Sequence, residues 1–214
     1  MLNVDFLKDS YADALLDYAV LIIYPLAVGR RELLLKPMGS FKQTIVLSLK
    51  IMAVSALFGW VGMKIIGSDN PQGLDGVVYS TGQYLKMNSL LPLIGFGEEF
   101  LCVLAFIGLF SLMSGGRLVK FLISLLAASL IFGFMHAFHS PFTAILVIGL
   151  GHIPFIFATF YFRSIIPAVI AHAAWDGFSF FSHFNEDLYY GFFSILMIVY
   201  FVYILIPKKK VVTN

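Results

Sequence analysis

The chain has 214 residues, of which 60% are hydrophobic and only 12% are charged, and its mean hydropathy is +0.92. A soluble domain carries about twice that charged fraction, so the composition excludes an ordinary soluble protein and indicates one that crosses a membrane several times. The net charge of +2 is too small to indicate a nucleic-acid partner, and the single cysteine excludes an internal disulfide.

A membrane-spanning helix needs about 20 mostly apolar residues, and the sequence contains seven stretches of this kind. In chain order the predicted spans are Leu15–Val28, Thr44–Ile66, Leu90–Met113, Leu118–Phe138, Phe142–Phe162, Ser164–Ser182 and Leu188–Ile206. The first is short and has Asp13 and Asp17 at its start, so it also fits a helix that begins at the membrane interface. Ser68–Met87 is the one long loop that we expect. The predicted fold is all-α, a polytopic transmembrane helical bundle, in a single integral-membrane domain of residues 1–214.

The basic residues predict how the chain is oriented in the membrane. With seven spans, the basic residues of the connecting segments all fall on one side; they are Arg30, Arg31, Lys36, Lys42, Arg117, Lys120, Arg163 and Lys208–Lys210. Segments rich in Lys and Arg stay in the cytoplasm, and Asp5, Asp9 and Glu186-Asp187 fall on the opposite side. We therefore expect the N-terminus outside and the C-terminus in the cytoplasm. The compact size and the basic loops indicate a prokaryotic plasma membrane.

Two adjacent carboxylates, Glu98 and Glu99, lie well inside the apolar stretch Leu90–Met113. An ionisable residue inside a span costs about 2.5–3.5 kcal/mol on insertion scales and usually has a function. The alternative is an interfacial acid pair on a span that starts at Phe100. Adjacent helical side chains point about 100° apart, so one glutamate faces a given point and the other needs a partner to one side. Two close carboxylates repel unless one is protonated or a cation intervenes, and one of them then suits general acid–base catalysis.

Two later spans also carry ionisable residues. Phe132 and His136 share one face of the fourth span, and His172 and Asp176 share one face of the sixth, because residues four apart are neighbours on a helix. His136 alone is compatible with a hydrogen-bonded core residue. Asp176 can orient and charge-stabilise the His172 ring, or both can ligate a metal ion. His152 lies close to a proline, and we assign it no role.

The order and spacing of these motifs resemble those of the CPBP family of intramembrane proteases, which includes the CAAX-prenyl endopeptidases and the bacterial Abi proteins. The family motifs are Glu-Glu-x-x-x-Arg, Phe-x-x-x-His and His-x-x-x-Asn or Asp. The corresponding segments of the chain are Glu98-Glu99-Phe-Leu-Cys-Val103, Phe132-Gly-Phe-Met-His136 and His172-Ala-Ala-Trp-Asp176. The resemblance covers residues 92–180. Val103 stands where the family has arginine, so Glu99 is either protonated or paired with another cation.

The resemblance implies an intramembrane endopeptidase that hydrolyses a peptide bond of a membrane-associated peptide or protein without a cofactor. The catalytic residues that it implies are Glu98, Glu99, His136, His172 and Asp176. Glu98 and His136 bind and deprotonate a water molecule, and His172 with Asp176 stabilises the oxyanion. Because a charged Asp176 would repel an oxyanion, Asp176 must be protonated or must hold His172 as a charged donor.

Three alternatives stay open. In the first, Glu98, His136, His172 and Asp176 form a metal site whose ligand types suit zinc; we favour the metal-free mechanism. In the second, the chain is a non-catalytic membrane scaffold or immunity protein of the family, which Val103 favours. The third is a proton-coupled transporter, although the chain shows no internal repeat of the kind that transporters often have. The expected partners are the lipid bilayer and a peptide or protein substrate, and we expect peptide processing rather than cleavage of prenylated proteins.

Overall fold

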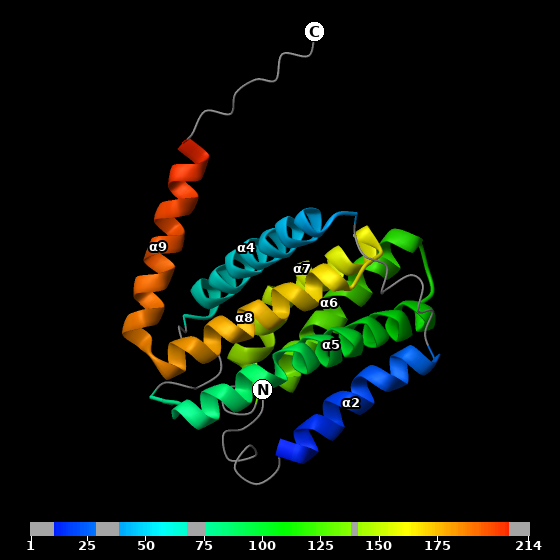
Figure 1. The fold of residues 1–214 in the computed structure, drawn as a ribbon. Helices are drawn as coiled ribbons and strands as arrows, with labels where there is room; N and C mark the ends of the chain where they lie inside the picture. The colour runs from blue at the N-terminus through cyan, green and yellow to red at the C-terminus, as the bar shows by residue number, and fades with distance from the viewer. Residues whose placement is uncertain (1–10, 29–38, 68–75, 138–140, 206–214) are drawn as a thin grey trace.

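A computed structural model describes residues 11–28, 39–67, 76–137 and 141–205 (Figure 1). The described residues form seven helices and no strand, which confirms the predicted all-α fold. The helices are α2 (Tyr11–Val28), α4 (Phe41–Ile66), α5 (Thr81–Leu112), α6 (Arg117–Met135), α7 (Pro141–Phe162), α8 (Ile166–Phe184) and α9 (Glu186–Leu205). Each overlaps one predicted span. Four of them, α4 to α7, are long and apolar enough to cross a membrane.

The start of α5 is the largest difference from the sequence prediction. The helix begins at Thr81 rather than Leu90, so the end of the predicted loop Ser68–Met87 is helical. The Ser80 hydroxyl accepts a hydrogen bond from the backbone N–H of Gln83, and the Gln83 side chain accepts one from the backbone N–H of Ser80. This reciprocal capping box satisfies two N–H groups that a helix start leaves without partners. It stabilises a helix start at Thr81, which lies before the apolar stretch and is therefore not predicted from apolar composition alone.

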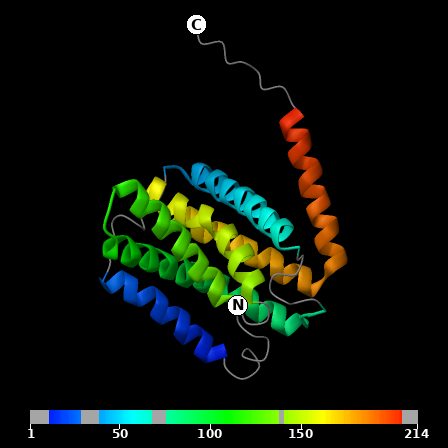
Figure 2. The same ribbon diagram turned by 180° about the vertical axis from the view of Figure 1, so that it is seen from behind.

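The helices form one bundle with α5 at its centre. In both views, α2 and α4 lie on opposite sides of the bundle with α5 to α8 between them, and α9 leaves the bundle at an angle (Figures 1 and 2). α5 packs against α2, α6 and α8, and α7 packs against α4 and α6. Side chains from several helices can therefore reach the glutamates of α5.

α6 and α7 approach each other closely at Gly133 and Gly149. A Cβ atom at Gly133 would lie 2.5 Å from the carbonyl oxygen of Ile145, which is closer than such atoms approach in proteins. Small residues allow this contact between membrane helices, where dispersion forces and hydrogen bonds hold the helices together. The close packing brings Phe132 of α6 and His152 of α7 into contact, with ring centroids 3.7 Å apart.

Large apolar side chains such as Leu57, Leu118 and Phe142 stand exposed on the outer surface of the bundle. Apolar surface of this extent suits lipid rather than water, and with the four long apolar helices it identifies an integral membrane protein. Many of the charged residues that predict orientation lie outside the described residues; they are Asp5, Asp9, Arg30, Arg31, Lys36 and Lys208–Lys210. The orientation and the single domain of residues 1–214 stay predictions.

Candidate active site

Both glutamates of α5 meet one histidine of α8. His172 Nδ1 lies 2.7 Å from Glu99 Oε1, and His172 Nε2 lies 3.3 Å from Glu98 Oε2. Because a carboxylate only accepts hydrogen bonds, Nδ1 donates to Glu99. α8 lies close enough to α5 for these contacts because residue 95 is glycine. A Cβ atom at Gly95 would lie 3.0 Å from the carbonyl oxygen of Val169. Two side chains that leave α5 in different directions thus converge on the two nitrogens of one ring.

His136 is fixed by the end of its own helix. It directly follows the last residue of α6, and its Nδ1 lies 2.9 Å from the carbonyl oxygen of Phe132. Carbonyl groups in the last turn of a helix lack backbone partners, so the ring donates to one of them. The proton on Nδ1 leaves Nε2 of the neutral ring as an acceptor. This Nε2 lies 3.6 Å from Glu98 Oε2.

Asp176 lies one turn after His172 on α8, and its Oδ2 is 3.6 Å from His172 Nε2. The Nε2 edge of the ring therefore faces two carboxylates, Asp176 and Glu98, while the Nδ1 edge faces Glu99. A His172 ring with a proton on both nitrogens carries a positive charge and has an acidic partner at each edge. The structure thus brings the five predicted site residues into one group, with Glu98, Glu99 and Asp176 at the edges of the His172 ring and His136 beside Glu98. The roles predicted for them stay predictions.

His152 of α7, to which we assigned no role from the sequence, lies in the same group. Its Nε2 is 3.3 Å from Glu99 Oε1. The ring lies between Phe132 and Phe155, with centroid distances of 3.7 and 4.8 Å. A signal was present in the sequence, because an ionisable residue inside an apolar span usually has a function. We gave His152 no role because it lies close to Pro154.

The position of the family arginine is apolar in this chain. Val103 is buried in a cluster that includes Ile165 and Val169. Glu99 meets the rings of two histidines instead of a guanidinium. Of the two alternatives, protonation or a cationic partner, the structure offers Glu99 a hydrogen-bond donor from α8, His172, while His152 of α7 lies near it without a hydrogen bond.

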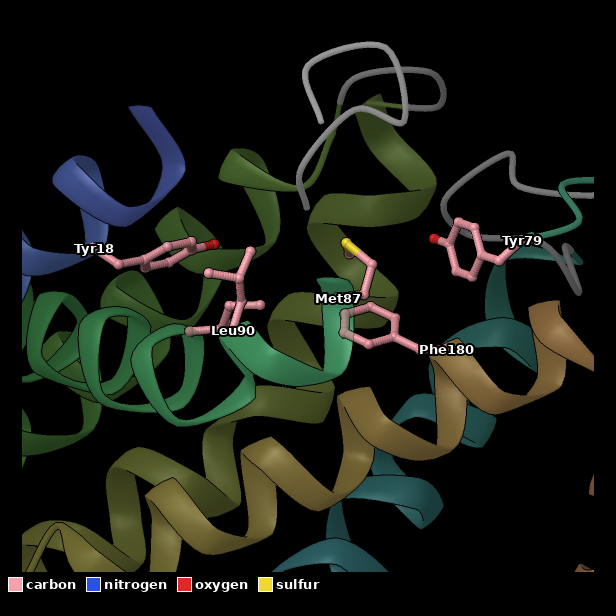
Figure 3. Packing of buried hydrophobic residues seen from close by; sticks show 6 residues of the cluster. Tyr18, Tyr79, Met87, Leu90 and Phe180 are labelled. Atoms are coloured by element: carbon pink, nitrogen blue, oxygen red, sulfur yellow. The ribbon is translucent and has the colours of Figure 1, made fainter. Parts of the chain in front are cut away.

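A second residue outside the motifs, Tyr18 of α2, contacts Glu98. Its hydroxyl donates a hydrogen bond of 2.9 Å to Glu98 Oε1. Figure 3 shows the Tyr18 ring reaching from α2 to lie beside Leu90 of α5. Gly97 leaves room for the ring, since a Cβ atom there would lie 2.7 Å from Tyr18 Cδ1. No motif or spacing in the first span marks this tyrosine.

The site has an accessible side and a closed side. The side chains of Glu98, His136 and Asp176 are 8%, 9% and 22% exposed, whereas those of Glu99 and His152 are 1% and 4% exposed. Within the described residues, Oε2 of each glutamate accepts no hydrogen bond of good geometry, and both atoms are buried. The side chain of Glu98 is thus more exposed than that of Glu99, although both residues are buried.

Three residues at the closed side offer ligand atoms for a metal ion. The atoms come from Glu99, His152 and His172 and lie within 4.8 Å of one another. Of the four ligands predicted for zinc, only His172 belongs to this group. Two ligands of a tetrahedral zinc ion lie about 3.3 Å apart, which the Glu99–His152 distance matches, whereas the 2.7 Å between Glu99 and His172 is that of a direct hydrogen bond. A structural zinc ion takes four protein ligands and a catalytic one needs an open position, so this closed group of three residues matches neither arrangement.

A protein-family model matches part of the chain. Residues 81–178 match this model, which is described as Type II CAAX prenyl endopeptidase Rce1-like. No match to a curated protein or to a solved structure was found. The matched segment includes the five predicted site residues and His152, whereas Tyr18 lies outside it. The predicted resemblance to the CPBP family, the CAAX proteases, is thus confirmed for a segment that covers a little under half of the chain.

Proposed function

We propose that the protein is an intramembrane endopeptidase that hydrolyses a peptide bond of a membrane-associated peptide or protein. The observation that carries the proposal is the pair of acceptors Glu98 Oε2 and His136 Nε2, which lie 3.6 Å apart. One water molecule at about 2.8 Å from each atom can donate a hydrogen bond to both. Such a water is oriented and lies against a carboxylate base. The match to a prenyl endopeptidase family supports peptide hydrolysis as the reaction.

In the proposed reaction, Glu98 moves one proton twice. Its carboxylate takes a proton from the water as the water oxygen bonds to the peptide carbonyl carbon. The Nε2–H group of His172 donates a hydrogen bond to the oxyanion that develops. As the C–N bond breaks, Glu98 returns the proton to the leaving nitrogen. The products are a carboxyl group and an amine, and Glu98 is again a carboxylate.

The closed side of the site holds His172 in place for this step. Glu99 accepts the hydrogen bond from Nδ1 at 2.7 Å, so Nε2 is directed to the accessible side. His152 Nε2 lies 3.3 Å from the same Glu99 oxygen without forming a hydrogen bond, so His172 is the donor that Glu99 has in place of an arginine. Asp176 supports His172 as a charged donor. These contacts favour catalysis over the non-catalytic alternative, whose main support was Val103.

Glu98→Gln and His136→Ala should each lower kcat by about 100- to 10,000-fold, because each removes one of the two groups that activate the water. The measurement is cleavage of an internally quenched peptide that ends in a farnesylated Cys-a-a-X sequence, alongside the same peptide without the farnesyl group. Glu186→Gln, at an exposed position at the start of α9, is the matched control and should cleave like wild type. Wild-type turnover by Glu98→Gln would refute the assigned role.

Asp176→Asn separates the metal-free mechanism from metal catalysis. Asparagine is a family residue at this position and donates hydrogen bonds without charge, so in the metal-free mechanism the variant should keep substantial activity. Chelators should leave the wild type unchanged. The control is Asp187→Asn, at an exposed position. An inactive Asp176→Asn protein, together with chelator inhibition that zinc reverses, would instead establish the metal mechanism.

For the orientation, we propose the N-terminus outside and the C-terminus in the cytoplasm of a prokaryotic plasma membrane, because basic residues stay on the cytoplasmic side. Cys102 is buried and is replaced by alanine, after which single cysteines are introduced as Asp9→Cys and Lys210→Cys. A membrane-impermeant maleimide on intact cells should label position 9 and should label position 210 only after lysis. Labelling of position 210 on intact cells would reverse the orientation.

A further inference from the structure

We infer that Tyr18 is a positioning residue for Glu98, so that α2 completes the active site from outside the family segment. The inference rests on the proposed function of Glu98 as the base. It concerns a residue that belongs to no motif and lies 80 positions before its partner in the chain.

The two oxygens of Glu98 have different surroundings. Oε1 accepts the hydrogen bond from the Tyr18 hydroxyl at 2.9 Å, while Oε2 lies 3.3 Å from His172 Nε2 and 3.6 Å from His136 Nε2. The terminal torsion of a glutamate has broad minima, so a carboxylate without this bond turns easily. The Tyr18 hydroxyl therefore fixes which oxygen faces the reacting water.

Packing holds the tyrosine in the place that this bond requires. Tyr18 is buried beside Leu90 of α5 (Figure 3), in an apolar cluster that also includes Ile94, and the missing side chain of Gly97 leaves space for its ring. A buried hydroxyl is costly without a hydrogen-bond partner, and Glu98 supplies that partner. The bond therefore satisfies two buried polar groups at once and ties α2 to the site.

The matched family segment does not contain this donor. Residues 81–178 include both glutamates and the three histidines that surround them, but α2 ends at Val28. The segment alone leaves Glu98 Oε1 without its tyrosine. Catalysis by this chain should therefore depend on a helix that the family resemblance does not cover.

Tyr18→Phe tests the inference, because it removes one oxygen and keeps the ring that packs on α5. With the quenched peptide that the wild type cleaves, farnesylated or not, as probe, kcat should fall about 10- to 100-fold, the effect of losing one hydrogen bond to a charged group. KM should stay close to wild type. The thermal midpoint should fall, because buried Glu98 Oε1 loses its donor, but a purely structural role would lower the midpoint without lowering kcat of the folded protein. Tyr79→Phe is the matched control: Tyr79 is buried in the same cluster, and its hydroxyl has no hydrogen-bond partner among the described residues.

Gly97→Ala provides a second test that leaves the hydroxyl in place. Its new Cβ would lie 2.7 Å from Tyr18 Cδ1, so the ring must shift and kcat should fall. Gly108→Ala on the same helix places a Cβ with no atom within 4 Å and should act like wild type. A Tyr18→Phe protein with wild-type kcat, in an assay where Glu98→Gln is inactive, would overturn the role of Tyr18 alone. Wild-type activity of Glu98→Gln would overturn the proposed function and this inference with it.

Discussion

Two carboxylates that follow one another on an apolar helix repel unless a donor lies between them, and in this chain that donor is His172. Its two ring nitrogens lie on different edges, so one ring serves two side chains that leave α5 about 100° apart. This requires α8 to lie against α5, which Gly95 permits. Loss of one partner from a buried charged pair costs about 3–5 kcal/mol. The contact of His172 with both glutamates therefore restricts which residues fit where α5 lies against α8. It also determines the chemistry of the site.

Around this contact, the groups proposed to react each have support from another part of the protein. Tyr18 holds Glu98, the carbonyl group of Phe132 holds His136, and Glu99 holds His172. No bulk water is present inside a membrane to solvate polar groups, so protein atoms must supply these partners. The division into an accessible side and a closed side follows from this arrangement, because the supporting groups occupy the protein interior. Both glutamates are buried in the bundle, and Glu98 keeps more exposed surface than Glu99.

The sequence predicts the helices and the motif residues well, because both depend on local patterns. Apolar stretches locate the helices, and ionisable residues inside those stretches identify Glu98, His136 and His172. The early start of α5 depends on the capping box at Ser80. The residues of this box are visible in the sequence, but they lie before the apolar stretch. Tyr18 is different, because its partner lies 80 residues away and only the packing of α2 on α5 brings the two together. His152 carried a readable signal, but its partner on α5 emerges only when α7 is placed in the bundle.

The central claim is that Glu98 reacts and Glu99 supports. The most direct measurement compares kcat of Glu98→Gln with kcat of Glu99→Gln in one peptide-cleavage assay, with thermal midpoints recorded for both proteins. Glu98→Gln should lose far more turnover, because it removes the base at the accessible side, whereas Glu99→Gln acts only through His172 and keeps an oxygen that accepts its hydrogen bond. A folded Glu99→Gln protein as inactive as Glu98→Gln, or less active, would contradict this division of roles.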